Sequence, residues 1–186
     1  TVDFEFGGNF GMGITNAQGQ AETIFTAPPS SGTYQFSAVF SGDAEYGESS
    51  ASGDVVVGPR PTIVVTSNSS FRLGTPTPLS AKLVDPANNS GIEGKTLNFY
   101  FNGSTIPAVT DSLGFSTASF SSPGSTGTYL YRAEFVGDGV TYIGSESVST
   151  VTIALNMTTI EARDGLSIKI YEPVSVEAVA RESIGL

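Results

Sequence analysis

Hydrophobic and polar residues alternate over short stretches of the chain. In the segment TLNFYFNG, which starts at Thr96, Leu97, Phe99 and Phe101 share one face and the residues between them share the other. A period of two is typical of a β-strand with one buried face. This alternation predicts strands at 61–67, 78–84, 96–101, 104–110, 114–120, 128–136 and 146–154.

The predicted inward faces are rich in aromatic residues. Two segments share the pattern, and their expected inward residues are Tyr34, Phe36, Ala38 and Phe40 in one and Tyr129, Tyr131, Ala133 and Phe135 in the other. Gly, Pro, Asn and Asp separate the runs, as in Asn102-Gly103 and Pro123-Gly124. An aromatic face opposite a polar one is what two packed sheets require. We therefore expect an all-β chain without helices.

The chain repeats itself at an interval of 95 residues. TYQFSAVFSGDAEY from Thr33 matches TYLYRAEFVGDGVTY from Thr128, and one inserted residue then shifts Tyr46 onto Tyr142. TVDFEFGG at the start matches TLNFYFNG, and Pro173-Val174-Ser175 matches Pro78-Leu79-Ser80. Such self-similarity indicates a tandem array of one structural unit.

The repeat places both chain ends inside a unit. We expect the C-terminal half of one domain at 1–58, a complete domain at 59–154 and the N-terminal half of a further domain at 155–186. Half a sandwich cannot close its core. Three arrangements would complete the halves: neighbouring parts of a longer polypeptide, residues 159–186 of another subunit added to residues 1–57, or pairing of the two halves within one chain.

The conserved spacing within the two copies resembles a known family. The pattern GTY-x-aromatic-x-Ala-x-Phe-x-Gly-Asp, followed by Tyr and a Ser-rich strand that ends in Val, resembles prokaryotic Ig-like repeat domains of cell-surface proteins. The resemblance covers nearly the whole chain and implies tandem immunoglobulin-like β-sandwiches at an extracellular surface. It also implies that Tyr34 and Tyr129 form tyrosine corners. The Cys pair and core Trp of antibody domains are absent.

Charge and composition narrow the classes of function. The net charge is −10 with only 8 Lys plus Arg, so no basic stripe is available for nucleic acid. No stretch approaches the length of apolar sequence that a membrane helix needs. The absence of His and Cys removes the commonest general base, the commonest transition-metal ligand and any disulfide. We expect no catalytic residue and no cofactor.

Acidic residues after two glycines are the best metal candidates. Asp43 and Glu45 follow Gly42, and Asp138 follows Gly137; carboxylates in this arrangement supply oxygen ligands to Ca²⁺. The alternative is that each Asp stabilises its own turn, because Asp after Gly often accepts bonds from its own backbone. The second copy keeps only the one acid, which favours the turn. We expect both glycines to be structural.

Four Asn-x-Ser/Thr sequons fall in or near predicted turns and are candidate glycosylation sites. They begin at Asn68, Asn88, Asn102 and Asn156.

Two functions remain open. The first is a structural repeat of an extracellular filament, stalk or surface layer, whose partners are copies of itself or flanking repeats, joined end to end. Strand complementation between half-domains is one way in which copies would join. The short linker Gly58-Pro59-Arg60 suits that role because proline limits bending. The second is an adhesin module that grips a glycan or a protein through its loops. In those loops Tyr46 and Tyr142 are the expected exposed aromatics.

Overall fold

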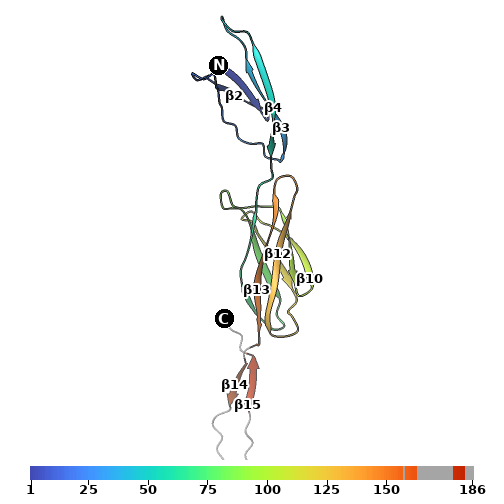
Figure 1. The fold of residues 1–186 in the computed structure, drawn as a ribbon. Helices are drawn as coiled ribbons and strands as arrows, with labels where there is room; N and C mark the ends of the chain where they lie inside the picture. Colours follow the sequence, from blue (N-terminus) through green and yellow to red (C-terminus); the bar gives the residue numbers. More distant parts are fainter. Residues whose placement is uncertain (157, 163–177, 183–186) are drawn as a thin grey trace, which may run out of the picture. The chain divides into compact units, whose positions relative to one another are not determined.

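The computed structural model describes residues 1–156, 158–162 and 178–182, and within these ranges the chain is built from strands without a helix (Figure 1). The expected all-β fold is therefore confirmed. The backbone clusters into two compact units, which are described separately. One comprises Thr1–Ile63, Val84–Ser90 and Phe135–Ser145, and the other Val64–Leu83, Gly91–Glu134 and the described part of Glu146–Leu186.

The N-terminal region forms a single four-stranded antiparallel sheet. Its order is β2-β1-β3-β4, and the strands are β1 (Val2–Phe6), β2 (Asn9–Gly13), β3 (Gly32–Phe40) and β4 (Ser49–Val57). A two-residue turn joins β1 to β2, with φ of 57° at Gly7 and 81° at Gly8. Two consecutive positive φ values produce the tight hairpin turn that matches strand twist, and glycine adopts them without strain.

The middle of the chain forms a sandwich of two sheets. The larger sheet has the order β10-β9-β12-β13-β6, with β6 (Ser69–Arg72), β9 (Thr96–Phe101), β10 (Ser104–Val109), β12 (Gly127–Gly137) and β13 (Ile143–Ala154). The smaller sheet has the order β11-β7-β5, with β5 (Ile63–Thr66), β7 (Thr77–Asp85) and β11 (Phe115–Phe120), and β8 (Ser90–Gly91) pairs with β7.

The core lies between these two sheets. Leu79 of β7 and Phe99 of β9 are both fully buried. The ring centroids of Phe101 and Phe120 lie 5.6 Å apart in an edge-to-face arrangement, which joins β9 to β11. The hydroxyl of Tyr131 lies 2.9 Å from the carbonyl oxygen of Ser67 and 3.2 Å from that of Ser80. Because a buried hydroxyl needs a hydrogen-bond partner, these contacts fix β12 against the opposite sheet.

All seven strands expected in the complete repeat are present, within three residues of their expected ends. Two additional strands, β6 and β8, were not expected. β6 is a four-residue run without clear alternation, and it forms by parallel pairing with β13, where Phe71 lies opposite Ile153. That pairing joins residues more than eighty positions apart in the chain, so a local pattern cannot predict it.

The N-terminal sheet and the larger sheet of the sandwich share one topology. Strands β2-β1-β3-β4 follow the same order as β10-β9-β12-β13, and matching residues lie 95 positions apart until the single insertion. The pairing register is also the same, because Phe6 lies opposite Phe36 and Phe101 lies opposite Tyr131. The repeat in sequence is therefore a repeat in structure.

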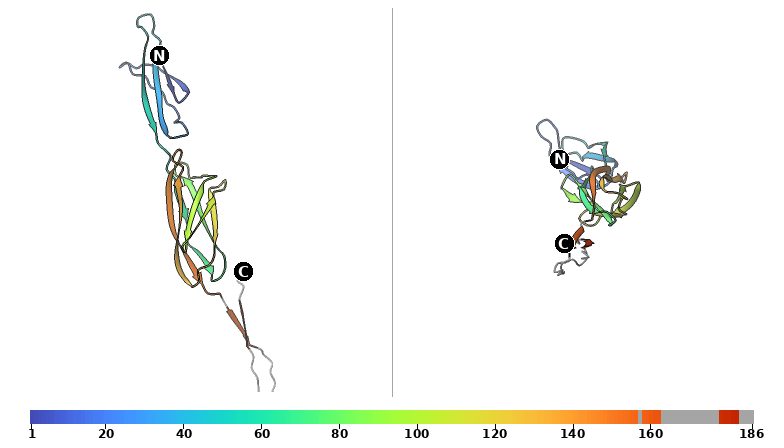
Figure 2. Two further views of the ribbon diagram at one scale, coloured as in Figure 1. Left: turned by 90° about the vertical axis from the view of Figure 1, so that its right-hand side faces the viewer. Right: turned by 90° about the horizontal axis from the view of Figure 1, so that it is seen from below.

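Near the C-terminus, β14 (Thr158–Ala162) and β15 (Ala178–Glu182) pair as an antiparallel two-stranded ribbon, drawn in orange and red in Figure 2. Ile160 lies opposite Ala180 in that ribbon. The matched segment Pro173-Val174-Ser175 lies outside the described residues, as does the rest of 163–177.

Candidate functional site

One face of the N-terminal sheet carries hydrophobic side chains, and no second sheet within the described residues covers them. In the sandwich the corresponding face is closed by β11, β7 and β5. The exposed fraction is 37% for Phe36 but 1% for its counterpart Tyr131, and 38% for Val55 but 0% for its counterpart Val151. The residues of this open face are Val2, Phe4, Phe6, Phe36, Ala38, Phe40, Val55 and Val57. We call this set the open face.

A cluster of three aromatic rings closes one end of the open face. The ring centroids of Phe6 and Phe25 lie 6.0 Å apart, and those of Phe6 and Tyr34 lie 6.2 Å apart. Phe6 is consequently buried, although it belongs to a sheet with an open side. The sandwich contains the same trio, and there the corresponding distance from Phe101 to Tyr129 is 6.1 Å. This part of the core thus forms without a second sheet.

Beside the trio the open face forms a groove of about 320 Å³. Phe4, Phe36 and Val55 are among its apolar lining residues, and the carboxylate-bearing Glu5 and Glu22 also line it. The remaining lining residues are Phe6, Thr23 and Phe25. An apolar groove of this kind on a sheet face is suited to other apolar side chains, because it offers area to remove from water and few polar groups to bind.

The segment that borders the groove contains no strand. Residues 20–25 match β11 at an interval of 95 positions, and their side chains alternate between exposed and partly buried in the same way. In the sandwich β11 pairs with β7 over its whole length, from Phe115 opposite Lys82 to Phe120 opposite Thr77. The described residues 14–31 include no strand that could play the part of β7. No described strand therefore gives the backbone of residues 20–25 the hydrogen bonds that β7 gives to β11.

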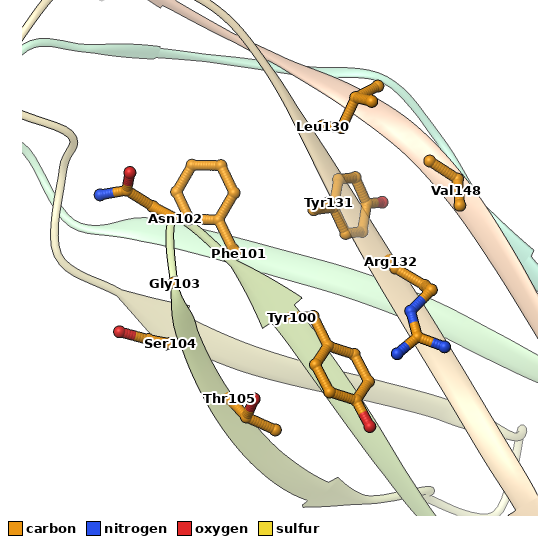
Figure 3. A pocket seen from close by; sticks show the side chains of 10 residues that line it. All are labelled: Tyr100, Phe101, Asn102, Gly103, Ser104, Thr105, Leu130, Tyr131, Arg132 and Val148. Atoms are coloured by element: carbon orange, nitrogen blue, oxygen red, sulfur yellow. The ribbon is translucent and has the colours of Figure 1, made fainter.

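The outward face of the sandwich has a second groove, of about 450 Å³, shown in Figure 3. The guanidinium of Arg132 lies 4.0 Å from the ring centroid of Tyr100, and it also pairs with Glu146 at 2.5 Å. The Tyr100 hydroxyl donates to Glu134 at 2.7 Å, and this bond to a carboxylate raises the pKa of Tyr100. Leu130 and Val148 form the apolar part of the groove. The polar cluster is already internally satisfied.

The acidic candidates lie in turns and bind their own backbone. The carboxylate of Asp43 accepts from the amide nitrogens of Glu45 at 2.9 Å and Tyr46 at 2.8 Å, and these two bonds lower the pKa of Asp43. The carboxylate of Asp138 accepts from three consecutive amides, with the shortest distance, 2.7 Å, to Thr141. This is the geometry of a turn-stabilising Asp.

The glycines before these acids have positive φ, 83° at Gly42 and 93° at Gly137. A side chain at Gly137 would lie 2.8 Å from the amide nitrogen of Gly144. Glycine is therefore required there both by backbone conformation and by close approach of the chain. Within the described residues, no three acidic side chains gather closely enough to hold a metal ion.

Both expected corner tyrosines bind a carbonyl four residues upstream. The distance is 3.0 Å from the Tyr34 hydroxyl to the oxygen of Ser30, and 2.8 Å from the Tyr129 hydroxyl to the oxygen of Ser125. Each bond fixes the segment that leads into a long strand, β3 or β12.

All four sequon asparagines are exposed. The side-chain oxygen of Asn68 accepts from the Thr150 amide at 3.0 Å, and that of Asn88 accepts from the Ser90 amide at 3.0 Å. Asn102 has a positive φ of 47° in the turn before Gly103. Surface turns are the positions where glycosylation acceptors occur. Of the two expected loop aromatics, Tyr46 is exposed, whereas Tyr142 is partly buried.

The structure contains an ion pair at the linker that was not predicted from the sequence. The guanidinium of Arg60 binds the carboxylate of Asp85, whose side chain is buried. The backbone of Arg60 also binds the segment that leads from β12 into β13. Its amide donates to the carbonyl oxygen of Thr141 at 2.7 Å, and its carbonyl oxygen accepts from the amide of Ile143 at 2.8 Å. At the matching positions, 95 residues later, stand Leu155 and Ala180. The joint replacement of both charges by apolar residues is the signal that could have indicated the pair.

Within the part of the chain that the structure describes, no helix has the length and hydrophobicity to cross a membrane. No protein-family model matches the sequence, and no curated protein matches it.

Several solved structures align with the chain at low similarity. A 1.5-MDa bacterial ice-binding adhesin aligns over 87% of this chain and 56% of its own, with 12% identity and a TM-score of 0.42. Domains 4–9 of the surface-layer protein SbsC align over 88% of this chain and 24% of their own, with 14% identity and a TM-score of 0.36. A Bacteroides ovatus glucan-utilisation protein, SGBP-B, aligns over 92% and 42%, with 15% identity and a TM-score of 0.30. The chain spans little more than half of the first of these proteins, and likenesses at this level assign no function to it.

Proposed function

We propose that this chain is a structural repeat segment of an extracellular filament, stalk or surface layer, in which β-sandwich units follow one another end to end. The observation that carries the proposal is the duplication of one sheet, with the same strand order, register and aromatic trio, at an interval of 95 residues. Serial copies of one domain are how proteins span distance, because each unit contacts only its neighbours.

The connection between units supports a load-bearing role. Arg60 follows Gly58 and Pro59, and its backbone is bonded to Thr141 and Ile143 while its side chain binds Asp85. A linker that is bonded to the domain it enters bends less than a free one, and Pro59 restricts it further. The surface is acidic, with a net charge of −10, which opposes lateral collapse of neighbouring copies.

The proposal is tested on the native organism. Antibodies against this segment should label intact cells, and mild protease treatment of those cells should release the segment into the medium. Electron microscopy of the released or negatively stained material should find thin fibres or a regular layer. Retention of the protein inside protease-treated intact cells would contradict the proposal.

A binding module is the second candidate, because the outward groove of the sandwich carries an aromatic and a cationic side chain that the first repeat lacks at the matching positions. Glu5 and Ser37 stand where the sandwich has Tyr100 and Arg132. A groove with such side chains is suited to a glycan or a protein ligand. The test is binding to a glycan array. Leu130→Ser should abolish this binding, whereas Val56→Ser, which changes an exposed residue outside the groove, should leave it intact. This pair of results would favour a binding module over a purely structural role.

A further inference from the structure

We infer that the open face of the N-terminal sheet is a docking surface for the β14–β15 ribbon of a second copy of this chain. The inference rests on the proposed end-to-end assembly and names the surfaces that would meet. It predicts a directional contact, in which one copy supplies strands and the next supplies a sheet.

The first step is that the open face has the composition of a core. Phe4 occupies the position of Phe99, and Val55 that of Val151, both fully buried in the sandwich. Single exposed hydrophobic residues are common on protein surfaces, but a continuous row along three adjacent strands is not. The row is interrupted only where Phe25 already covers Phe6.

The second step is that the missing cover includes a ladder as well as side chains. In the sandwich, β7 binds β11 along one edge and its side chains Leu79 and Leu83 fill the core. Residues 20–25 have the alternation of β11, but no described strand pairs with them. Residues 77–82, which pair with β11, match residues 172–177, and these lie outside the described residues, so the docking contact is assigned to the side chains of the open face.

The third step identifies the occupant from the chain itself. β14 lies 95 positions after residues 63–67, which contain β5, and β15 lies 95 positions after residues 83–87, which contain the end of β7. β5 and β7 are hydrogen-bonded neighbours in the sheet that covers the sandwich core, and β14 and β15 are likewise paired. The ribbon therefore has the strand order of the missing cover.

The fourth step is that, among the described residues, the ribbon pairs with no third strand. β14 and β15 form a sheet of two strands, and such a ribbon alone is marginally stable in water. Ala178 is exposed in it, whereas the matching Leu83 is fully buried in the sandwich. Open face and ribbon are different surfaces, so their contact is heterologous and each copy retains one free face and one free ribbon. The product is a chain of copies.

The test measures the mass of the full chain by light scattering and sedimentation over a range of concentrations. The unchanged chain should form a ladder of oligomers that grows with concentration. Val55→Glu places a charge in the groove and should raise the apparent dissociation constant by about a hundredfold, because a buried unpaired charge is strongly unfavourable. Val56→Glu is the matched control: it alters the next residue of β4, which is 77% exposed on the opposite face, and should leave the ladder unchanged.

Mixing two defective chains tests direction. Ala178→Asp should disable the ribbon and leave the open face intact, whereas Val55→Glu does the reverse. Each variant alone should be monomeric, and an equal mixture should form a capped dimer and nothing larger. If Ala178→Asp chains still associate with one another, the open faces pair symmetrically and the inference is overturned.

A second readout separates a folding defect from a docking defect. All variants should keep the thermal transition of the sandwich, whose core they do not touch. A wild-type chain that remains monomeric at high concentration also overturns the inference, and it does so without affecting cell-surface labelling, which tests the proposed function separately.

Discussion

The N-terminal sheet and the larger sheet of the sandwich are the same structure in two environments. Their strand order and register agree, yet Phe36 and Val55 are more than one-third exposed while Tyr131 and Val151 are buried. Residues 20–25 and 115–120 share an alternating pattern, but only the second segment is a strand. The four-stranded sheet therefore forms without its cover, whereas the edge segment needs β7 beside it to become a strand. Pairing, rather than local propensity, decides the latter.

The largest difference between the two regions should appear when matching phenylalanines are truncated. Phe99→Ala is expected to destabilise the sandwich by about 3–5 kcal/mol, because it opens a cavity in a close-packed core. Phe4→Ala should cost about 1 kcal/mol in the monomeric chain, because Phe4 is already partly in water. Denaturant unfolding of each variant at low protein concentration measures both values. Equal losses would mean that the open face is covered within one chain.

The tyrosine of the sandwich offers a second comparison, because the N-terminal sheet has Phe36 in its place. Tyr131→Phe leaves the carbonyls of Ser67 and Ser80 without the hydroxyl, at an expected loss of about 1–2 kcal/mol. Burial also raises the pKa of Tyr131 above its ordinary value of 10.0. The folded state thus holds this proton more tightly, so its contribution is complete below pH 10.0 and is lost as the pH rises through the higher folded value.

Alkaline unfolding curves of the two proteins test that reasoning. The wild-type sandwich should lose stability above pH 10.0 more steeply than Tyr131→Phe. Phe36→Tyr serves as the control in the uncovered sheet and should leave the sandwich curve unaltered. Parallel curves for wild type and Tyr131→Phe would show that the hydroxyl has the same pKa in the folded and unfolded states.

Replacing the residues of the linker ion pair should cause a smaller loss of stability, and a second substitution should recover most of it. Arg60→Leu leaves the buried Asp85 carboxylate without its cation, and the expected loss is about 1 kcal/mol, reduced because Arg60 is itself about half exposed. Adding Asp85→Ala recreates the pair of residues found at 155 and 180, and should recover most of that loss. A double-mutant cycle by thermal unfolding measures the coupling. Additive losses would show that the two side chains act independently.

The smallest expected effect concerns the loop of the N-terminal sheet. Amide bonds from Glu45 and Tyr46 lower the pKa of Asp43 below 3.8, so the turn is favoured above that pH and loses its bonds as the pH falls through the lower folded value. The amide NMR signals of residues 45 and 46 should shift together below about pH 4. Asp43→Asn should abolish the titration while the strands remain. A pH-dependent shift of those amide signals near neutral pH would contradict the assigned bonds.

Much of this fold was predictable because its signals are local. The alternation of Leu97, Phe99 and Phe101 gives both a strand and its buried face, and Asn102-Gly103 gives the hairpin that follows. The features that were missed depend on distant residues. β6 exists because β13 pairs with it, whereas residues 20–25 form no strand because no described strand pairs with them. The division into 1–58, 59–154 and 155–186 remains a prediction from the repeat.

The open face was predictable as an inward face, but its groove was not, because a groove depends on where Phe25 packs. The turn geometry of Asp43 and Asp138 follows from the Gly-Asp pattern, whereas the pair of Arg60 and Asp85 joins residues whose local contexts are unrelated.

Gly114 and Gly19 occupy the same place in their repeats, with φ of 82° and 78°. At Gly114 an added methyl group would lie 2.5 Å from the oxygen of Leu83, whereas at Gly19 it would meet nothing within 4 Å. Conformation alone allows asparagine or aspartate at either site; steric crowding removes that freedom only at Gly114. The residue type at position 19 in natural variants of the chain therefore reports whether the first repeat is covered. If the first repeat functions uncovered, some variants should have Asn or Asp at position 19. If a second sheet covers it in an assembly, the variants should keep glycine there.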